Sequence, residues 1–168
     1  MHWLVEIARQ AVEEFVSHGK IIPPPDAIPP EYLEKAGVFV CLKKNGELRG
    51  CIGTFSPCTG SIAKETIANA VSAAGRDPRF NPVGPDELPN LVYSVDVLSA
   101  PEKVHDVHGL DQKKYGIILQ SGYKRGLLLP DLEGVDSVED QIRITKMKAG
   151  ILPAEAVEIY RFTVTRYS

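Results

Sequence analysis

The sequence has no long apolar run, no large excess of one charge and few cysteines. No stretch approaches the ~20 consecutive apolar residues that a membrane helix needs. Residues 2–16 alternate charged with apolar side chains instead of forming the apolar core of a signal peptide. A net charge of −3 offers no general attraction to nucleic acid. These absences argue against membrane and nucleic-acid partners and indicate a cytoplasmic protein.

Three cysteines are too few for a disulfide framework, and an odd number leaves at least one thiol free. Reduced thiols in a reducing compartment fit this count. His105 and His108 resemble half of a metal site, but no second cluster completes the four ligands that zinc requires. We therefore predict no metal and no resident cofactor, and we expect both histidines in a polar surface connection.

Length and periodicity predict one domain, residues 1–168, with 43% apolar residues to form its core. Apolar residues at helical spacing predict three main helices, and shorter apolar runs predict strands in addition to a central hairpin. The expected helices are 2–18, 61–74 and 137–149, and the expected strands are 91–98, 116–120, 126–129 and 157–166. Helices mixed with hairpins, without βαβ alternation, predict an α+β fold around a mainly antiparallel sheet.

A proline-rich segment, residues 23–30, follows the first helix. Each proline fixes φ and lacks a backbone donor, so the segment must be extended. It either lies as a stiff strap over the body of the domain or serves as a docking segment for an aromatic groove on a partner. The first alternative is favoured, because docking normally needs a mobile segment.

An Asn-Gly dipeptide between two apolar runs predicts that residues 38–44 and 47–55 form a β-hairpin with a two-residue turn. A regular register places Cys41 opposite Gly50. Cys41 and Cys51 then point to opposite faces of the sheet, so no disulfide is expected between them.

The second arm of this hairpin carries the strongest candidate for chemistry. Arg49 and Cys51 share one face in the regular register, and a nearby positive charge favours the reactive thiolate. Cys51 is thus a candidate nucleophile or redox thiol, with Cys58 as a weaker candidate for a resolving thiol. The alternative is a small packing residue in a half-buried hairpin, with Gly50 and Gly53 allowing close approach.

Two groups of charged residues outside the hairpin have alternative roles. Arg76, Asp77 and Arg79 could hold an anion, or Asp77 could pair with one arginine and pin the loop. Glu139, in the first turn of the third helix, could pair with Arg143 four residues later or act as an acid or base in a cleft.

Several ordered motifs resemble those of the Alport-syndrome chromosomal-region (AMME) protein family, and in particular its microbial branch, AmmeMemoRadiSam system protein A. The resemblance covers nearly the whole chain. It is carried by the segments 48–55, 76–80, 87–88, 126–130, 134–139 and 148–150.

This resemblance implies a larger and a smaller subdomain around a cleft. It also implies a functional association with a Memo-like protein and a radical S-adenosylmethionine protein, which would hold any metal chemistry. The family pattern matches the hairpin, the loop after the second helix and the start of the third helix, at Arg49, Gly50, Cys51, Gly53, Arg79, Phe80 and Glu139. If the protein is an enzyme, we expect Cys51, Arg49 and Glu139 to be its catalytic residues. The expected binding residues are Gly50, Gly53, Arg79 and Phe80, with Arg79 orienting an anionic substrate. The expected function is an enzyme component or accessory subunit, with a non-catalytic protein- or ligand-binding module as the alternative.

Overall fold

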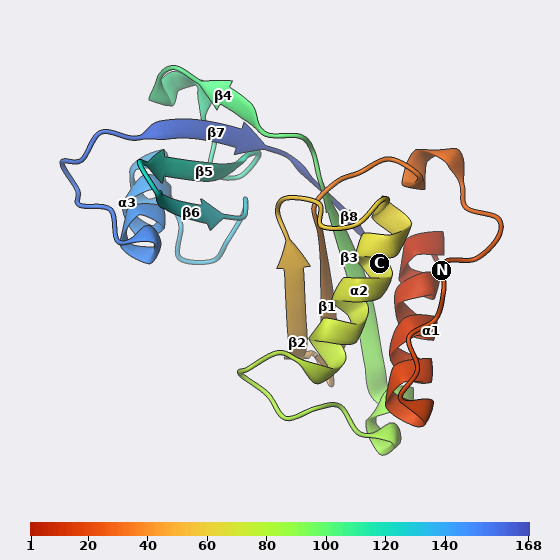
Figure 1. Ribbon diagram of the computed structural model, residues 1–168. Helices are drawn as coiled ribbons and strands as arrows, with labels where there is room; N and C mark the ends of the chain where they lie inside the picture. The colour runs from red at the N-terminus through yellow and green to blue at the C-terminus, as the bar shows by residue number, and fades with distance from the viewer. The chain divides into compact units, whose positions relative to one another are not determined.

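The computed structural model describes residues 1–168, which form two units (Figure 1). The first unit contains residues 1–98 together with 165–168, and the second contains residues 99–164. The second unit is therefore inserted in the sequence between two strands of the first. Each unit combines an antiparallel sheet with helices, which confirms the predicted α+β class.

The first unit is a four-stranded sheet whose strand order is β2-β1-β3-β8. Its strands are β1 (Val38–Lys44), β2 (Glu47–Thr54), β3 (Leu91–Leu98) and β8 (Val164–Tyr167). Helices α1 (Trp3–His18) and α2 (Ile62–Gly75) pack on one face of this sheet (Figure 1). The sheet contributes buried residues at every second position of β1, namely Val38, Val40 and Leu42.

Local sequence explains where these helices begin and end. The imidazole of His2 accepts a hydrogen bond from the backbone N–H of Leu4 at the start of α1, and Gly19 ends the helix in a left-handed conformation. The hydroxyl of Ser61 caps α2 through the N–H of Lys64. Both predicted helices are confirmed to within one residue at each end.

The proline-rich segment is a strap. Ile28 within the segment and Ile22 just before it are half-buried and pack against the core of the first unit. The segment ends in a short 3-10 turn, η1 (Pro30–Tyr32), in which Tyr32 is buried. The strap interpretation is therefore confirmed for this part of the chain.

The second unit is a smaller sheet with the order β4-β7-β5-β6, packed against α3 (Val138–Ala149). Its strands are β4 (Glu102–Val104), β5 (Gly116–Ser121), β6 (Lys124–Leu128) and β7 (Glu158–Phe162), and a 3-10 turn, η3 (Val107–Gly109), follows β4. Ile117, Leu119, Leu128 and Ile151 form the centre of its core. Ser137 caps α3 and Gly150 ends it, in agreement with the helix expected at residues 137–149.

One strand prediction is wrong. Residues 157–166 do not form a single strand, because the chain leaves one sheet and joins the other within this segment. β7 ends at Phe162 in the sheet of the second unit, and β8 begins at Val164 in the sheet of the first. No helix in the structure has the length and apolar character required to cross a membrane.

Candidate functional site

The hairpin β1–β2 forms as predicted, but its register differs by one residue. Asn45 and Gly46 both have positive φ, as a type I′ turn requires. Lys43 lies opposite Leu48 and the next pair is Leu42 with Gly50, so Arg49 is the extra residue of a β-bulge. Because side chains alternate along a strand, a shift of one residue moves every later side chain to the other face.

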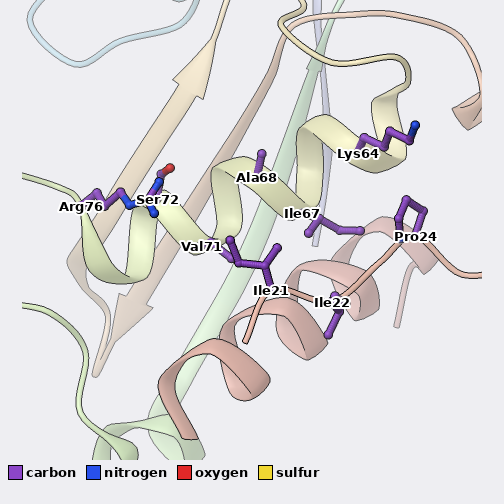
Figure 2. A pocket seen from close by; sticks show the side chains of 9 residues that line it. All are labelled: Ile21, Ile22, Pro24, Lys64, Ile67, Ala68, Val71, Ser72 and Arg76. Atoms are coloured by element: carbon purple, nitrogen blue, oxygen red, sulfur yellow. The ribbon is translucent and has the colours of Figure 1, made fainter. Parts of the chain in front are cut away.

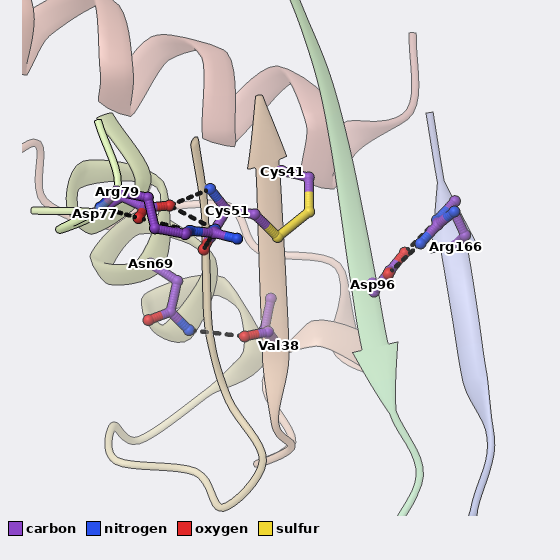
Figure 3. Close-up of a disulfide and its surroundings, with 8 residues drawn as sticks. All are labelled: Val38, Cys41, Cys51, Asn69, Asp77, Arg79, Asp96 and Arg166. Carbon is purple, nitrogen blue, oxygen red and sulfur yellow. Dashed lines mark hydrogen bonds and ion pairs between the residues drawn. A yellow bond between two sulfur atoms is a disulfide. The ribbon is translucent and has the colours of Figure 1, made fainter. Parts of the chain in front are cut away.

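This shift places Cys41 directly opposite Cys51, and the two form a disulfide (Figure 3). Their Cα atoms are 4.1 Å apart, close to the ~4.5 Å of an antiparallel pair whose backbone groups do not bond each other. Two expectations are therefore wrong: that Cys41 and Cys51 face opposite ways, and that both are reduced thiols. The bulge at Arg49 is the reason. Cys58 is the free cysteine and is exposed, so Cys51 is bonded to Cys41 rather than to Cys58.

The backbone of Cys51 is held from its outer side by the loop that follows α2. Its N–H donates to Oδ2 of Asp77 at 3.0 Å, and its carbonyl accepts from Nη2 of Arg79 at 3.2 Å (Figure 3). Arg79 also binds Asp77, with Nη2 2.7 Å from Oδ2 and Nε 3.0 Å from Oδ1. Of the two sequence alternatives, the structure has the one in which Asp77 pairs with an arginine and pins the loop.

Asp77 is almost fully buried, with 2% of its side chain exposed, while 55% of the Arg79 side chain is exposed. The hydrogen bonds from Arg79 lower the pKa of Asp77 well below its usual range, and the N–H groups of Cys51 and Arg79 act in the same direction. Asp77 is thus a carboxylate that links a strand edge to an arginine.

A second carboxylate, Glu87, holds the bulge residue. It lies in the 3-10 helix η2 (Pro85–Asn90), and its Oε1 and Oε2 accept from Nε and Nη2 of Arg49 at 2.9 and 3.0 Å. Lys44 and the N–H of Gly84 donate to the same carboxylate. These donors, with Arg49 first, lower the pKa of Glu87 to about 2.

The ring of Phe80 lies near both arginines. The guanidinium carbon of Arg79 is 5.5 Å from the ring centroid and that of Arg49 is 6.0 Å away. These distances are typical of cation–π contacts. Arg49, Cys51, Arg79 and Phe80 are therefore brought together by the structure, and two buried or half-buried carboxylates neutralise the arginines.

The glycines of the motif are approached by the chain itself. A Cβ on Gly50 would lie 2.2 Å from the carbonyl oxygen of Ala73 in α2. A Cβ on Gly53 would lie 2.1 Å from the ring of Phe39. Both positions therefore need glycine for packing, which agrees with the packing alternative of the sequence analysis.

A cavity of about 370 Å³ lies on the face of the sheet that carries Cys41, and all its lining residues belong to the first unit. Its walls include Leu48, Val92 and Arg166. Arg166 of β8 binds the buried carboxylate of Asp96 in β3 with two hydrogen bonds of 2.7 Å, which ties this edge of the sheet together (Figure 3). Cys41 and Cys51 are both half-buried.

Glu139 belongs to the second unit and is exposed in the first turn of α3. The expected pairing with Arg143 is wrong, because Arg143 binds Asp140 at 3.5 Å instead. In the same unit His108 contacts Asp106, and no group of three or more histidine, cysteine or acidic side chains is arranged to hold a metal ion.

Sequence reasoning missed Cys41 and Glu87 as members of this site. Cys41 was assigned to the wrong face by the regular register. Glu87 is 38 residues from Arg49 along the chain, and neither periodicity nor local spacing indicates such a pairing. Two signals mark Glu87: it lies in the motif segment 87–88, and it follows three residues after Gly84, whose N–H donates to its carboxylate.

These features define a two-unit α+β protein with a neutralised arginine and cysteine cluster on its larger sheet. The chain matches the AMMECR1 family model over residues 5–167, and it belongs to this family. A protein from Thermotoga maritima is 53% identical over 169 residues, with 99% of this chain and 97% of that protein covered. The protein CA_C1420 of Clostridium acetobutylicum is 48% identical, and this chain spans about a third (35%) of its length.

The fold has a counterpart among solved structures. The crystal structure of the uncharacterized protein PH0010 from Pyrococcus horikoshii superimposes with a TM-score of 0.88 at 37% sequence identity. The match covers 98% of this chain and 88% of that one. None of these names states an activity, so the comparisons define the family and the fold.

Proposed function

We propose that this protein is an accessory subunit that binds a partner protein, rather than an enzyme that uses Cys51 as a nucleophile. The observation that carries the proposal is that every reactive group around Cys51 already has a partner within the chain. Its sulfur is bonded to Cys41, its N–H donates to Asp77 and its carbonyl accepts from Arg79. A nucleophilic cysteine needs a thiolate and an adjacent base.

The two arginines support the same proposal. Arg49 donates to both carboxylate oxygens of Glu87 through Nε and Nη2, and Arg79 donates to both carboxylate oxygens of Asp77 through the same two nitrogens. In each pair the carboxylate neutralises the charge that would attract an anionic substrate, so such binding is weakened. The contribution of these pairs is to fix the loop after α2 against the hairpin.

The exposed part of this cluster has the character of a protein contact. More than half of the Arg79 side chain is exposed (55%), and it stacks on the half-buried ring of Phe80. Arginine and aromatic residues are enriched among the side chains that dominate binding energy at interfaces. We place the contact with the partner at Arg79 and Phe80. Gly50 and Gly53 have packing roles in this proposal, Gly50 against Ala73 and Gly53 against Phe39.

The proposed partners follow from the family resemblance. They are a Memo-like protein and a radical S-adenosylmethionine protein, in the cytoplasm. In this proposal any iron–sulfur or other metal chemistry belongs to the partners. Glu139, in the other unit, then has no catalytic task.

The experiment is a binding titration of the full chain with each purified partner. Phe80→Ala should weaken binding at least tenfold, and Tyr123→Ala is the matched control, because Tyr123 is a 94% exposed aromatic in the second unit. Cys51→Ser should leave the dissociation constant within about twofold, as expected for a residue outside the contact. Unchanged binding of Phe80→Ala would refute the contact. If Cys51→Ser bound the partner as tightly as the unchanged protein but the complex lost its enzymatic activity, the non-catalytic role of Cys51 would be refuted.

A second candidate function is a thiol–disulfide redox component, favoured by the bonded cysteine pair beside the 370 Å³ cavity. In this reaction an external dithiol attacks the disulfide, Cys41 and Cys51 gain two electrons and two protons, and the dithiol becomes a disulfide.

Equilibration of the native protein in dithiol redox buffers tests this candidate. Reversible reduction at about −180 to −270 mV would support it, whereas a potential below about −300 mV is that of a structural disulfide.

A further inference from the structure

A second cavity in the first unit lies between the strap and α2, away from the disulfide (Figure 2). Its volume is about 250 Å³. One wall is Pro24 of the strap with Ile21 and Ile22 just before it. The other wall is α2 with its C-cap residue, namely Lys64, Ile67, Ala68, Val71, Ser72 and Arg76.

The walls of this cavity are apolar and preformed. Ile67 and Val71 are buried in α2, while Ile21, two residues before the strap, remains 58% exposed although it faces them. Ala68 is the small residue between them on the same helix face, and it leaves space that a larger side chain would fill. Consecutive prolines keep the strap extended, so it cannot fold into the cavity.

Hydrogen-bond donors stand at one end of the cavity. Ser72 and Arg76 are four residues apart on α2 and lie side by side (Figure 2). Arg79 and Arg166 each bind a carboxylate, whereas Arg76 has neither an ion pair nor a side-chain hydrogen bond within the chain. This end of the cavity therefore has two hydrogen-bond donors for a ligand, the guanidinium of Arg76 and the hydroxyl of Ser72.

Lys64 lies at the opposite end of the cavity (Figure 2). Arg76 lies twelve positions further along the chain, which is roughly 18 Å along the helix axis. A volume of about 250 Å³ holds roughly eight water-sized groups at about 30 Å³ each. A ligand of that size cannot reach both cations, so its single anionic group belongs at the end with two donors.

We propose that this cavity binds a small amphipathic carboxylic acid, of medium chain length or branched. The apolar body lies against Ile21, Ile67 and Val71, and the carboxylate accepts hydrogen bonds from Arg76 and Ser72. This site is independent of the partner contact at Arg79 and Phe80, so each can fail without the other.

The test is calorimetric titration of the full chain with octanoate, whose size matches the cavity. We expect one site with a dissociation constant of about 1 mM or tighter, and at least tenfold weaker binding of octanol and octylamine. Arg76→Gln should weaken octanoate binding at least tenfold, because a charge-assisted hydrogen bond is lost. Lys64→Gln, the matched control at the far end, should change it less than threefold.

Ala68→Phe provides a second variant, because Ala68 is exposed on α2 and the larger side chain fills the cavity without disturbing the core. It should abolish octanoate binding and leave the melting temperature unchanged within a few degrees. Thermal unfolding of Arg76→Gln checks that the variant is folded, since a cation at a helix C-terminus also favours the helix. Three results would each overturn the proposal. They are no binding at about 10 mM octanoate, binding of octylamine as tight as that of octanoate, and binding of octanoate to Ala68→Phe as tight as to the unchanged protein.

Discussion

Gly50→Ala tests how closely β2 and α2 approach beneath the arginine and cysteine cluster. The new Cβ would lie 2.2 Å from the carbonyl oxygen of Ala73, and the obstacle is backbone on both sides. Carbon–oxygen contacts in proteins are found at about 3.3–3.6 Å, so the helix and the strand must separate by about 1 Å. No side-chain rotation relieves this clash.

The expected cost is about 3 kcal/mol or more, the upper part of the range for overpacked cores. For a unit of roughly 100 residues this lowers the melting temperature by about 12–24 °C. Trp3 is the only tryptophan and lies in α1, so its fluorescence reports on unfolding of the first unit alone.

Gly60→Ala is the matched control, because a Cβ there meets nothing nearer than the flexible end of Lys64 at 3.8 Å. It should change the free energy of unfolding by less than about 0.5 kcal/mol. A cost below about 1 kcal/mol for Gly50→Ala would show that the helix and strand are not in backbone contact.

Three further predictions concern single side chains, each measured by urea unfolding. Glu87→Gln should make the free energy of unfolding depend less on pH in acid. Arg49 lowers the pKa of Glu87 from 4.5 to about 2. The stabilisation from this carboxylate is therefore complete above pH 4.5 and is lost as the pH falls toward 2. Asp77→Asn should cost about 1–3 kcal/mol, because the charge-assisted hydrogen bonds between the buried carboxylate and Arg79 are lost. Tyr93→Phe should be neutral or stabilising by up to about 1 kcal/mol, because the buried hydroxyl has no hydrogen-bond partner.

Matched controls carry the same chemical change at exposed positions: Glu47→Gln, Asp26→Asn and Tyr123→Phe. The first should retain the full acid dependence, and the other two should be neutral within about 0.5 kcal/mol. The contact of Glu87 with Arg49 would be contradicted if Glu87→Gln left the pH dependence of stability in acid unchanged. The contact of Asp77 with Arg79 would be contradicted if Asp77→Asn cost less than about 1 kcal/mol. The absence of a partner for the Tyr93 hydroxyl would be contradicted if Tyr93→Phe lost more than about 1 kcal/mol.

Local patterns in the sequence predict much of this fold. The Asn-Gly turn specifies the hairpin, and β3 occupies the expected residues 91–98. The spacing of apolar residues locates the helices expected at 61–74 and 137–149, which the structure has at Ile62–Gly75 and Val138–Ala149. These features depend on residues within a few positions of each other, which is why they are readable from the sequence.

The parts that sequence reasoning missed depend on distant residues. Arg49 bulges out of its strand and is held by Glu87, and this irregularity brings Cys41 to Cys51. The transfer of the chain between two sheets at Thr163 likewise depends on strand pairing that no local pattern specifies. One residue of register therefore decides whether Cys51 is free or bonded, and with it the chemistry expected at the site.

The central claim is that Cys51 is not a nucleophilic thiol, and alkylation of the native protein tests it directly. In protein isolated without reductant, mass spectrometry should find Cys58 alkylated and a linked peptide pair containing Cys41 and Cys51. The Cys58→Ser variant has no free thiol, so it should not react with the alkylating agent until a dithiol reduces the disulfide. Rapid alkylation of Cys51 in the unreduced native protein, with a midpoint well below the pH of about 8.5 typical of a free thiol, would contradict the account.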